Sequence, residues 1–287
     1  MALRRRGLLI SVVRIVALSY AGLTALLFVF QRQYIYYPDR APREQLEARA
    51  GRDGLAPWRA EGERLIGWWT PAADARVLVF HGNAGSAVDR SYFVWAFNAR
   101  PAGRSWQVCI LEYPGYGARE GAPGERTMVA AGLEALDALL AESERPVILL
   151  GESLGSGVAA QVAAARPDRV AGLLLLTPFS TLADAAAVHY PYLPVRWMLR
   201  DRFDSVAALR GYAGPVAVVV AEHDRVVPAR LGRRLVASYD GPTRLFEQAG
   251  RDHNTLELDP GADWWEDAVT FLLPAAREDE ALSDGGR

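Results

Sequence analysis

Cysteine and an excess of one charge are the two features that this sequence lacks most clearly. Cys109 is the only cysteine among 287 residues, which excludes an intrachain disulfide, a cysteine-based zinc cluster and a CxxC redox site. The formal net charge is −2, so the basic field typical of nucleic-acid-binding proteins is absent and we expect no nucleic-acid partner. Hydrophobic residues make up 51% of the chain and charged residues 23%, which excludes a disordered or fibrous protein.

One long apolar run lies near the N-terminus. Residues 7–30 contain a single charge, Arg14, and as a helix they would measure about 36 Å, enough to cross a hydrocarbon core of about 30 Å. Several tyrosines follow closely, as in the aromatic belt of a membrane interface. We therefore expect residues 1–33 to form an uncleaved membrane anchor. A cleaved signal peptide and a buried core helix are the alternatives.

The charges around this run predict its orientation. Arg4, Arg5 and Arg6 precede it, which favours a cytoplasmic N-terminus. We therefore expect a single-pass membrane protein whose folded domain lies outside the cytoplasm, which in a bacterium is the periplasmic face of the inner membrane.

The remainder of the chain, residues 34–275, alternates short apolar runs with helical patterns. Buried runs separated by helical windows predict an α/β fold with a mostly parallel, twisted sheet and helices on both faces. Strands are expected at 64–69, 76–80, 107–111, 147–150, 171–176, 215–221 and 243–246, and helices at 86–100, 125–141, 154–165, 229–238 and 262–273. Residues 178–214 break this rhythm and predict a lid-like insertion between two strands. Residues 276–287 are acidic and glycine-rich, and we expect a loose tail.

The sequence Gly151-Glu152-Ser153-Leu154-Gly155 is a G-x-S-x-G pattern between an apolar strand and a helix of small residues. This context is typical of a tight strand-to-helix turn that exposes a nucleophilic serine. Ser153 is therefore the candidate nucleophile, and an ordinary helix-capping serine is the alternative.

A serine hydroxyl needs a base to remove its proton. In this type of turn the chain order is nucleophile, acid, histidine. Of the four histidines, His253 follows the last expected strand in a glycine-containing loop and fits the base. Asp224 directly follows an apolar strand and fits the acid that orients the imidazole. A helix cap is the alternative role of Asp224, and Glu222 and Asp252 are the other candidate acids.

An oxyanion hole requires two backbone N–H donors. One is expected from Leu154, the residue after the nucleophile, and the other from the loop after the strand at 76–80, where Asn83 is our choice. We expect His81, in the same loop, to be structural.

These motifs together resemble the α/β-hydrolase-fold serine hydrolases. The chain is most similar to a subgroup with an N-terminal membrane anchor, which includes eukaryotic palmitoyl-protein thioesterases and bacterial relatives. The resemblance implies Ser153, Asp224 and His253 as a catalytic triad. Pro114 stands where the family loop often has arginine, which leaves the substrate preference open. The matching segments are VLVFHGNAGS (77–86), YPGYG (113–117), LLGESLGSGVA (149–159), TPFSTL (177–182), HDRVVP (223–228) and GRDHNTL (250–256).

The resemblance implies an esterase or thioesterase that works through an acyl-enzyme and needs no metal or organic cofactor. The expected partners are the membrane and a small-molecule or lipid-like acyl substrate. A serine peptidase or an acyltransferase on the same fold, and a non-catalytic membrane-tethered scaffold, are the alternatives.

Overall fold

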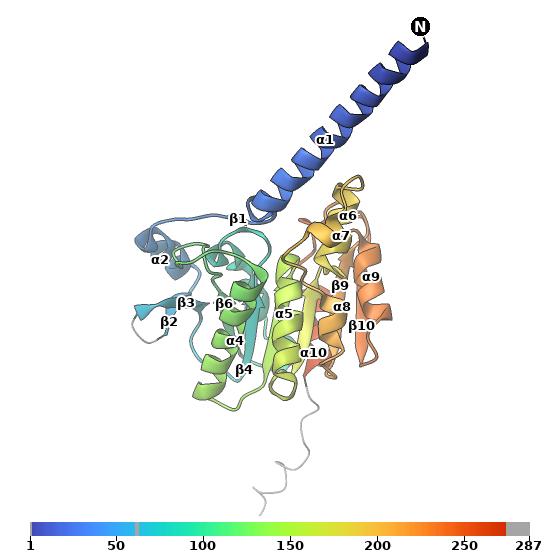
Figure 1. Ribbon diagram of the computed structural model, residues 1–287. Coiled ribbons are helices and arrows are strands. Elements are labelled where there is room, and N and C mark those ends of the chain that lie inside the picture. Colours follow the sequence, from blue (N-terminus) through green and yellow to red (C-terminus); the bar gives the residue numbers. More distant parts are fainter. Residues whose placement is uncertain (1, 61–62, 274–287) are drawn as a thin grey trace, which may run out of the picture.

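The computed structural model describes residues 2–60 and 63–273 (Figure 1). The expected tail at 276–287 lies outside these described residues. The body is built on an eight-stranded sheet with the strand order β10-β9-β8-β7-β4-β6-β3-β2. Its strands are β2 (Ala56–Arg59), β3 (Leu65–Trp69), β4 (Ala75–Phe80), β6 (Trp106–Leu111), β7 (Val147–Glu152), β8 (Gly172–Leu176), β9 (Val216–Ala221) and β10 (Thr243–Gln248).

The sheet is mostly parallel, as the apolar runs predict. Strand β3 pairs antiparallel with both β2 and β6, and the other neighbouring strands run parallel. Every residue of β4, β6 and β9 is buried. Continuous burial explains why these strands are mostly apolar, with Arg76 and Gln107 as the polar exceptions, and do not alternate apolar and polar residues.

Helices cover both faces of the sheet, and each face has its own hydrophobic core (Figure 1). One core includes side chains of α4 (Glu125–Glu142), α5 (Leu154–Ala165), α8 (Ser205–Leu209) and α9 (Ala229–Ala237). The other includes side chains of α2 (Arg43–Arg52), α3 (Tyr92–Asn98) and α10 (Asp263–Leu272). This is the α/β-hydrolase architecture that the sequence predicts, with the active-site loops expected at the carboxyl ends of the parallel strands.

Some elements differ from the expectations. The helix expected at 86–100 is divided into a 3₁₀ turn, η2 (Ala87–Arg90), and α3. A capping box formed by Ser86 and Asp89 closes that turn, so the helical spacing spans two short elements. Helix α2 and strand β2 were not expected. Helix α2 is largely polar and buries only Leu46 and Ala50, so its sequence shows no helical period. Two short 3₁₀ turns, η3 (Pro101–Gly103) and η4 (Pro167–Arg169), lie in loops.

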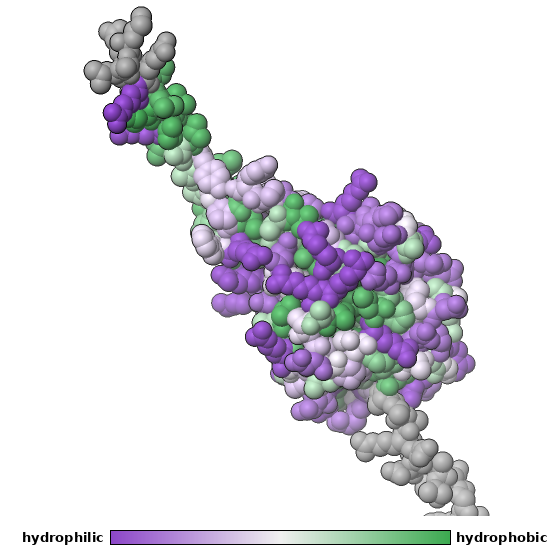
Figure 2. Space-filling view, turned by 90° about the vertical axis from the view of Figure 1, so that its right-hand side faces the viewer, coloured by the Kyte–Doolittle hydropathy of each residue, from purple (hydrophilic) through white to green (hydrophobic). Residues whose placement is uncertain are grey.

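The N-terminal run forms one helix, α1 (Ala2–Ile35), that projects away from the body (Figure 1). It ends two residues beyond the expected boundary at residue 33. Its apolar stretch is long enough to cross a membrane. Its apolar surface contrasts with the face of the body seen in Figure 2, where hydrophilic residues surround a smaller apolar area. Directly after α1, strand β1 (Tyr37–Pro38) pairs in parallel with β5 (Ala84–Gly85).

The insertion between β8 and β9 contains three short helices, α6 (Leu182–His189), α7 (Val195–Met198) and α8. Helices α6 and α7 lie at the end of the body from which α1 emerges (Figure 1).

Candidate active site

Ser153 occupies a sharp turn between β7 and α5. Its backbone has φ 51° and ψ −114°, a left-handed φ that a residue with a side chain rarely adopts. The Ser153 N–H donates to the Leu176 carbonyl at 2.9 Å, which ties the turn to the neighbouring strand β8. A Cβ atom at Gly155 would lie 2.0 Å from the Phe80 carbonyl oxygen, so only glycine permits the first turn of α5 to approach β4 this closely.

Ser153, His253 and Asp224 lie in one chain of hydrogen bonds. His253 Nε2 is 3.0 Å from Ser153 Oγ, and His253 Nδ1 is 2.7 Å from Asp224 Oδ2. An imidazole that donates from Nδ1 to the carboxylate leaves Nε2 as the acceptor for the serine hydroxyl proton. The three side chains come from the turn after β7, the loop after β9 and the loop after β10, as the sequence predicts.

Asp224 is held in place from its other oxygen. Oδ1 accepts hydrogen bonds from the N–H groups of Val226 at 2.8 Å and Val227 at 2.7 Å. The Asp224 side chain is only 1% exposed, so both oxygens are shielded from water and committed to named donors. Asp224 therefore caps the backbone N–H groups of the following turn with one oxygen and contacts the His253 imidazole with the other.

The two other candidate acids have different contacts. Glu222 Oε2 accepts from the Gly250 N–H at 2.8 Å, and Asp252 Oδ1 accepts from the His253 N–H. Both carboxylates thus stabilise the backbone of the loop that carries His253, while the imidazole contacts Asp224.

Leu154 and Asn83 are the two residues expected to form an oxyanion hole. Leu154 directly follows the turn at Ser153, and Asn83 lies in the loop after β4. Leu154 is the first residue of α5, so its N–H has no acceptor within the helix. Asn83 lies between β4 and β5. Its side-chain amide donates to the Ile35 carbonyl, and its backbone carbonyl accepts from the Tyr116 hydroxyl at 2.8 Å.

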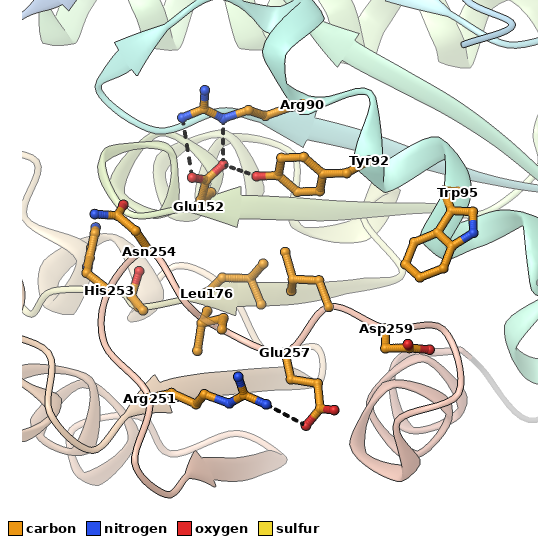
Figure 3. Close-up of a pocket in the computed structure, with 13 residues that line it drawn as sticks. Arg90, Tyr92, Trp95, Glu152, Leu176, Arg251, His253, Asn254, Glu257 and Asp259 are labelled. Atoms are coloured by element: carbon orange, nitrogen blue, oxygen red, sulfur yellow. Dashed lines mark hydrogen bonds and ion pairs between the residues drawn. The ribbon is translucent and has the colours of Figure 1, made fainter.

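A cavity of about 610 Å³ opens beside His253 (Figure 3). Its walls combine apolar and charged side chains, so it can accommodate a substrate with both kinds of surface. The lining residues include Trp95, Leu176, His253, Asn254, Leu256 and Leu258.

One group in this cavity was not identified from the sequence. Glu152 precedes Ser153 and accepts hydrogen bonds from Arg90 Nε at 2.9 Å and the Tyr92 hydroxyl at 3.1 Å (Figure 3). Burial lowers the pKa of Arg90 and the charge of Glu152 raises it, with a net rise. Glu152 stands at a variable position of the G-x-S-x-G pattern, and its partners come from a distant helical segment, so no local signal identified the group.

His81 and Glu112 form a buried pair beneath the loop that carries Asn83. His81 is fully buried against the rings of Tyr113 and Tyr116, with centroids 4.2 Å and 5.2 Å away, which agrees with the expected structural role. Burial lowers the pKa of His81 to about 3, so the imidazole is neutral. Burial raises the pKa of Glu112 to about 7, although hydrogen bonds from the Ala87 N–H and the Trp68 indole oppose this rise.

Within residues 2–60 and 63–273, no group of three or more histidine, cysteine, aspartate or glutamate side chains is arranged to hold a metal ion.

Comparisons with known proteins agree with this fold. A model of the alpha/beta hydrolase fold matches residues 75–225. An uncharacterized protein of Mycobacterium tuberculosis is 36% identical over 274 residues, which cover 92% of this chain and 95% of that protein. Lysophosphatidylserine lipase ABHD12 of Macaca fascicularis is 30% identical over 210 residues, which cover 66% of this chain and 52% of that protein. The solved Pyrococcus furiosus esterase Pf2001 shares the fold, with a TM-score of 0.60, 15% identity, and coverage of 83% of this chain and 96% of that chain.

The raised pKa of Glu112 predicts a pH-dependent stability that Glu112→Gln removes. The folded-state pKa of about 7 exceeds the ordinary value of 4.5, so the protonated carboxyl stabilises the fold below pH 4.5, and this contribution is lost as the pH rises through 7. The glutamine is less stable at low pH, because its NH2 group replaces one of the two oxygens that accept from the Ala87 N–H and the Trp68 indole, and an NH2 group cannot accept. We expect the melting temperature of Glu112→Gln to lie below that of the wild type at about pH 5. The difference should shrink by several degrees by about pH 8, because only the wild type loses stability.

Thermal unfolding of both full-length proteins in the same detergent measures this difference. The titration of His81 is present in both proteins and largely cancels in the difference. A deficit that stays constant across the range would contradict the assigned protonation of Glu112.

Proposed function

Because this chain belongs to the α/β-hydrolase fold family, we propose that it is a serine hydrolase that cleaves acyl esters or thioesters through an acyl-enzyme intermediate. The observation that carries the proposal is the hydrogen-bonded chain from Asp224 through His253 to Ser153. Ser153, Asp224 and His253 are the proposed catalytic residues, in the order along the chain that this fold uses.

In the proposed reaction, Ser153 Oγ attacks the acyl carbonyl carbon while its proton moves to His253 Nε2. The imidazolium then gives this proton to the departing alcohol or thiol, and the acyl group remains on the serine oxygen. A water molecule attacks the acyl-enzyme, His253 takes the proton of that water, and the acid product leaves as Ser153 regains its hydrogen. Asp224 holds the imidazole and stabilises its transient positive charge throughout.

The negative charge on the carbonyl oxygen requires donors that are already in position. We assign this role to the N–H groups of Leu154 and Asn83, and Leu154 also stands at the N-terminus of α5, where the helix dipole favours negative charge. The contacts of Asn83 with Ile35 and Tyr116 support a rigid position for this residue.

A lipid-like acyl compound is the substrate class that we favour. One relative is named a lysophosphatidylserine lipase, and the cavity beside His253 has leucine and tryptophan side chains together with charged groups. Because a serine peptidase or an acyltransferase would form the same acyl-enzyme, product analysis with ester, thioester and amide substrates of increasing chain length separates these activities.

We also propose that α1 anchors the chain in a membrane, with residues 1–33 as the anchor and residues 34–275 as the hydrolase domain. The length and apolar character of α1 support this assignment, and the arginines before it favour a cytoplasmic N-terminus. The hydrolase domain would then lie outside the cytoplasm, on the periplasmic face of a bacterial inner membrane.

A fluorophosphonate probe, which reacts with activated serine hydroxyls, tests the nucleophile. We expect the full-length protein to be labelled and Ser153→Ala to lose both labelling and ester hydrolysis, because no other serine contacts His253 Nε2 in the described residues. Ser238→Ala is the matched control, since Ser238 caps the C-terminal end of α9, and it should retain both. Wild-type protein that remains unlabelled at several pH values, although folded, would favour the non-catalytic scaffold.

A reporter fused to the C-terminus tests the orientation in the membrane. Alkaline phosphatase, which becomes active outside the cytoplasm, should be active on the full-length chain in a bacterial host. We expect it to be inactive when residues 2–33 are deleted, because the domain then stays in the cytoplasm. Equal phosphatase activity of both fusions, or activity of neither, would contradict the proposed topology.

A further inference from the structure

Part of the insertion lies directly alongside the anchor helix. This tip segment, Tyr190–Leu199, follows α6 and includes α7. The Tyr20 hydroxyl donates to the Tyr192 carbonyl at 2.7 Å, and Gln31 Nε2 donates to the Met198 carbonyl at 3.2 Å. The tip segment therefore accompanies α1 over the turns between Tyr20 and Gln31.

Helix length places the tip segment at the level of the membrane. The apolar run of α1, residues 7–30, measures about 36 Å. Suppose that the bilayer ended on the N-terminal side of the tip segment. The contact of α1 with this segment begins at Tyr20, and we allow one helical turn of about 5.4 Å for the reach of the Tyr20 side chain. Only residues 7–23 would then remain in the bilayer. These residues span about 26 Å, less than a hydrocarbon core of about 30 Å, and Arg14 would lie near the centre of the span, where a charge is most costly.

The exposed side chains of the tip segment suit a membrane interface. Tyr192 is 88% exposed and Trp197 is 87% exposed, and Tyr190 is also exposed. Tyrosine and tryptophan are enriched where membrane and water meet, because their rings are apolar and carry one polar group. The only charged residue in the segment, Arg196, is paired with Asp184 at 2.8 Å.

Most of the backbone N–H groups of the tip segment are satisfied within the protein. An unsatisfied N–H group costs several kcal/mol in lipid, yet Pro191 and Pro194 have no N–H group. Six of the segment's eight N–H groups donate to carbonyls of the same segment or of α6, and those of Tyr192 and Arg196 do not. The six belong to Tyr190, Leu193, Val195, Trp197, Met198 and Leu199.

An apolar groove of about 220 Å³ lies between the tip segment and the C-terminal part of α1. Its walls are almost entirely hydrocarbon and aromatic, and in water they would be an exposed apolar surface. They include Leu27, Ile35, Ala186, Leu193, Val195 and Met198.

We propose that the tip segment is embedded in the membrane leaflet nearer the hydrolase domain, where lipid acyl chains cover it and the groove beside α1. The protein then has a second membrane contact besides its anchor. This contact fixes the hydrolase domain against the lipid surface. It rests on the proposed anchoring of α1 and does not depend on the chemistry proposed for Ser153.

Depth-dependent fluorescence quenching tests this proposal on the full-length chain in vesicles of phosphatidylcholine with a minority of phosphatidylglycerol. Cys109 is buried, so a fluorescent thiol reagent can be directed to a single introduced cysteine. The test positions are Tyr192→Cys and Trp197→Cys, and Leu18→Cys on α1 reports on the anchor. Asp240→Cys is the control for exposure to water, because it lies in the loop before β10, at the opposite end of the sheet.

Lipids with a doxyl group on the acyl chain should quench the labels at Tyr192→Cys and Trp197→Cys several-fold more than the label at Asp240→Cys, and they should also quench the label at Leu18→Cys. Quenching at Leu18→Cys, with both tip positions at the level of Asp240→Cys, would overturn the proposal and leave the anchor intact. Absence of quenching at Leu18→Cys would overturn the anchor and the tip contact together. Neither result depends on hydrolase activity.

Discussion

The sharp turn at Ser153 is the constraint on which the rest of the site depends. A non-glycine residue with φ 51° and ψ −114° costs on the order of 1–3 kcal/mol and persists only where the surroundings impose it. Here β7 enters the turn, α5 leaves it, and the approach of Gly155 to the Phe80 carbonyl fixes the angle between them. The hydroxyl therefore points away from the helix that follows it and toward His253, which lies one hundred residues later in the sequence.

Strand pairing brings the proposed acid and base together. Strands β9 and β10 run parallel with Ala221 opposite Gln248, so the loops that carry Asp224 and His253 leave the sheet side by side. The His223 N–H donates to the Arg251 carbonyl at 2.8 Å and joins the two loops beyond the strands. On the other side of the turn, the pairing of β1 with β5 connects the end of α1 to the loop that carries Asn83. The C-terminal end of α1 and the proposed oxyanion loop thus form one structural unit.

Most of the sheet and the three hydrogen-bonded residues could be predicted from the sequence because their signals are local. Buried parallel strands are mostly apolar runs, and the strand, glycine and small-residue pattern around Ser153 is distinctive. Helix α2 was missed because it buries too few side chains to show a period. The contact of Glu152 with Arg90 and the contact of the tip segment with α1 join residues that are far apart in the sequence. Such contacts are set by the tertiary fold, and no local pattern contains them.

The central claim is that Asp224 holds His253 in the form that activates Ser153. The most direct measurement is the rate at which a fluorophosphonate reacts with Ser153 in the wild type and in Asp224→Asn. The asparagine carbonyl can still accept from the Val226 and Val227 N–H groups, while its amide opposes the Nδ1–H and favours the wrong imidazole tautomer. We expect the rate to fall by roughly 10³–10⁴-fold with an unchanged melting temperature. A rate within about tenfold of the wild type, in a folded variant, would contradict the account.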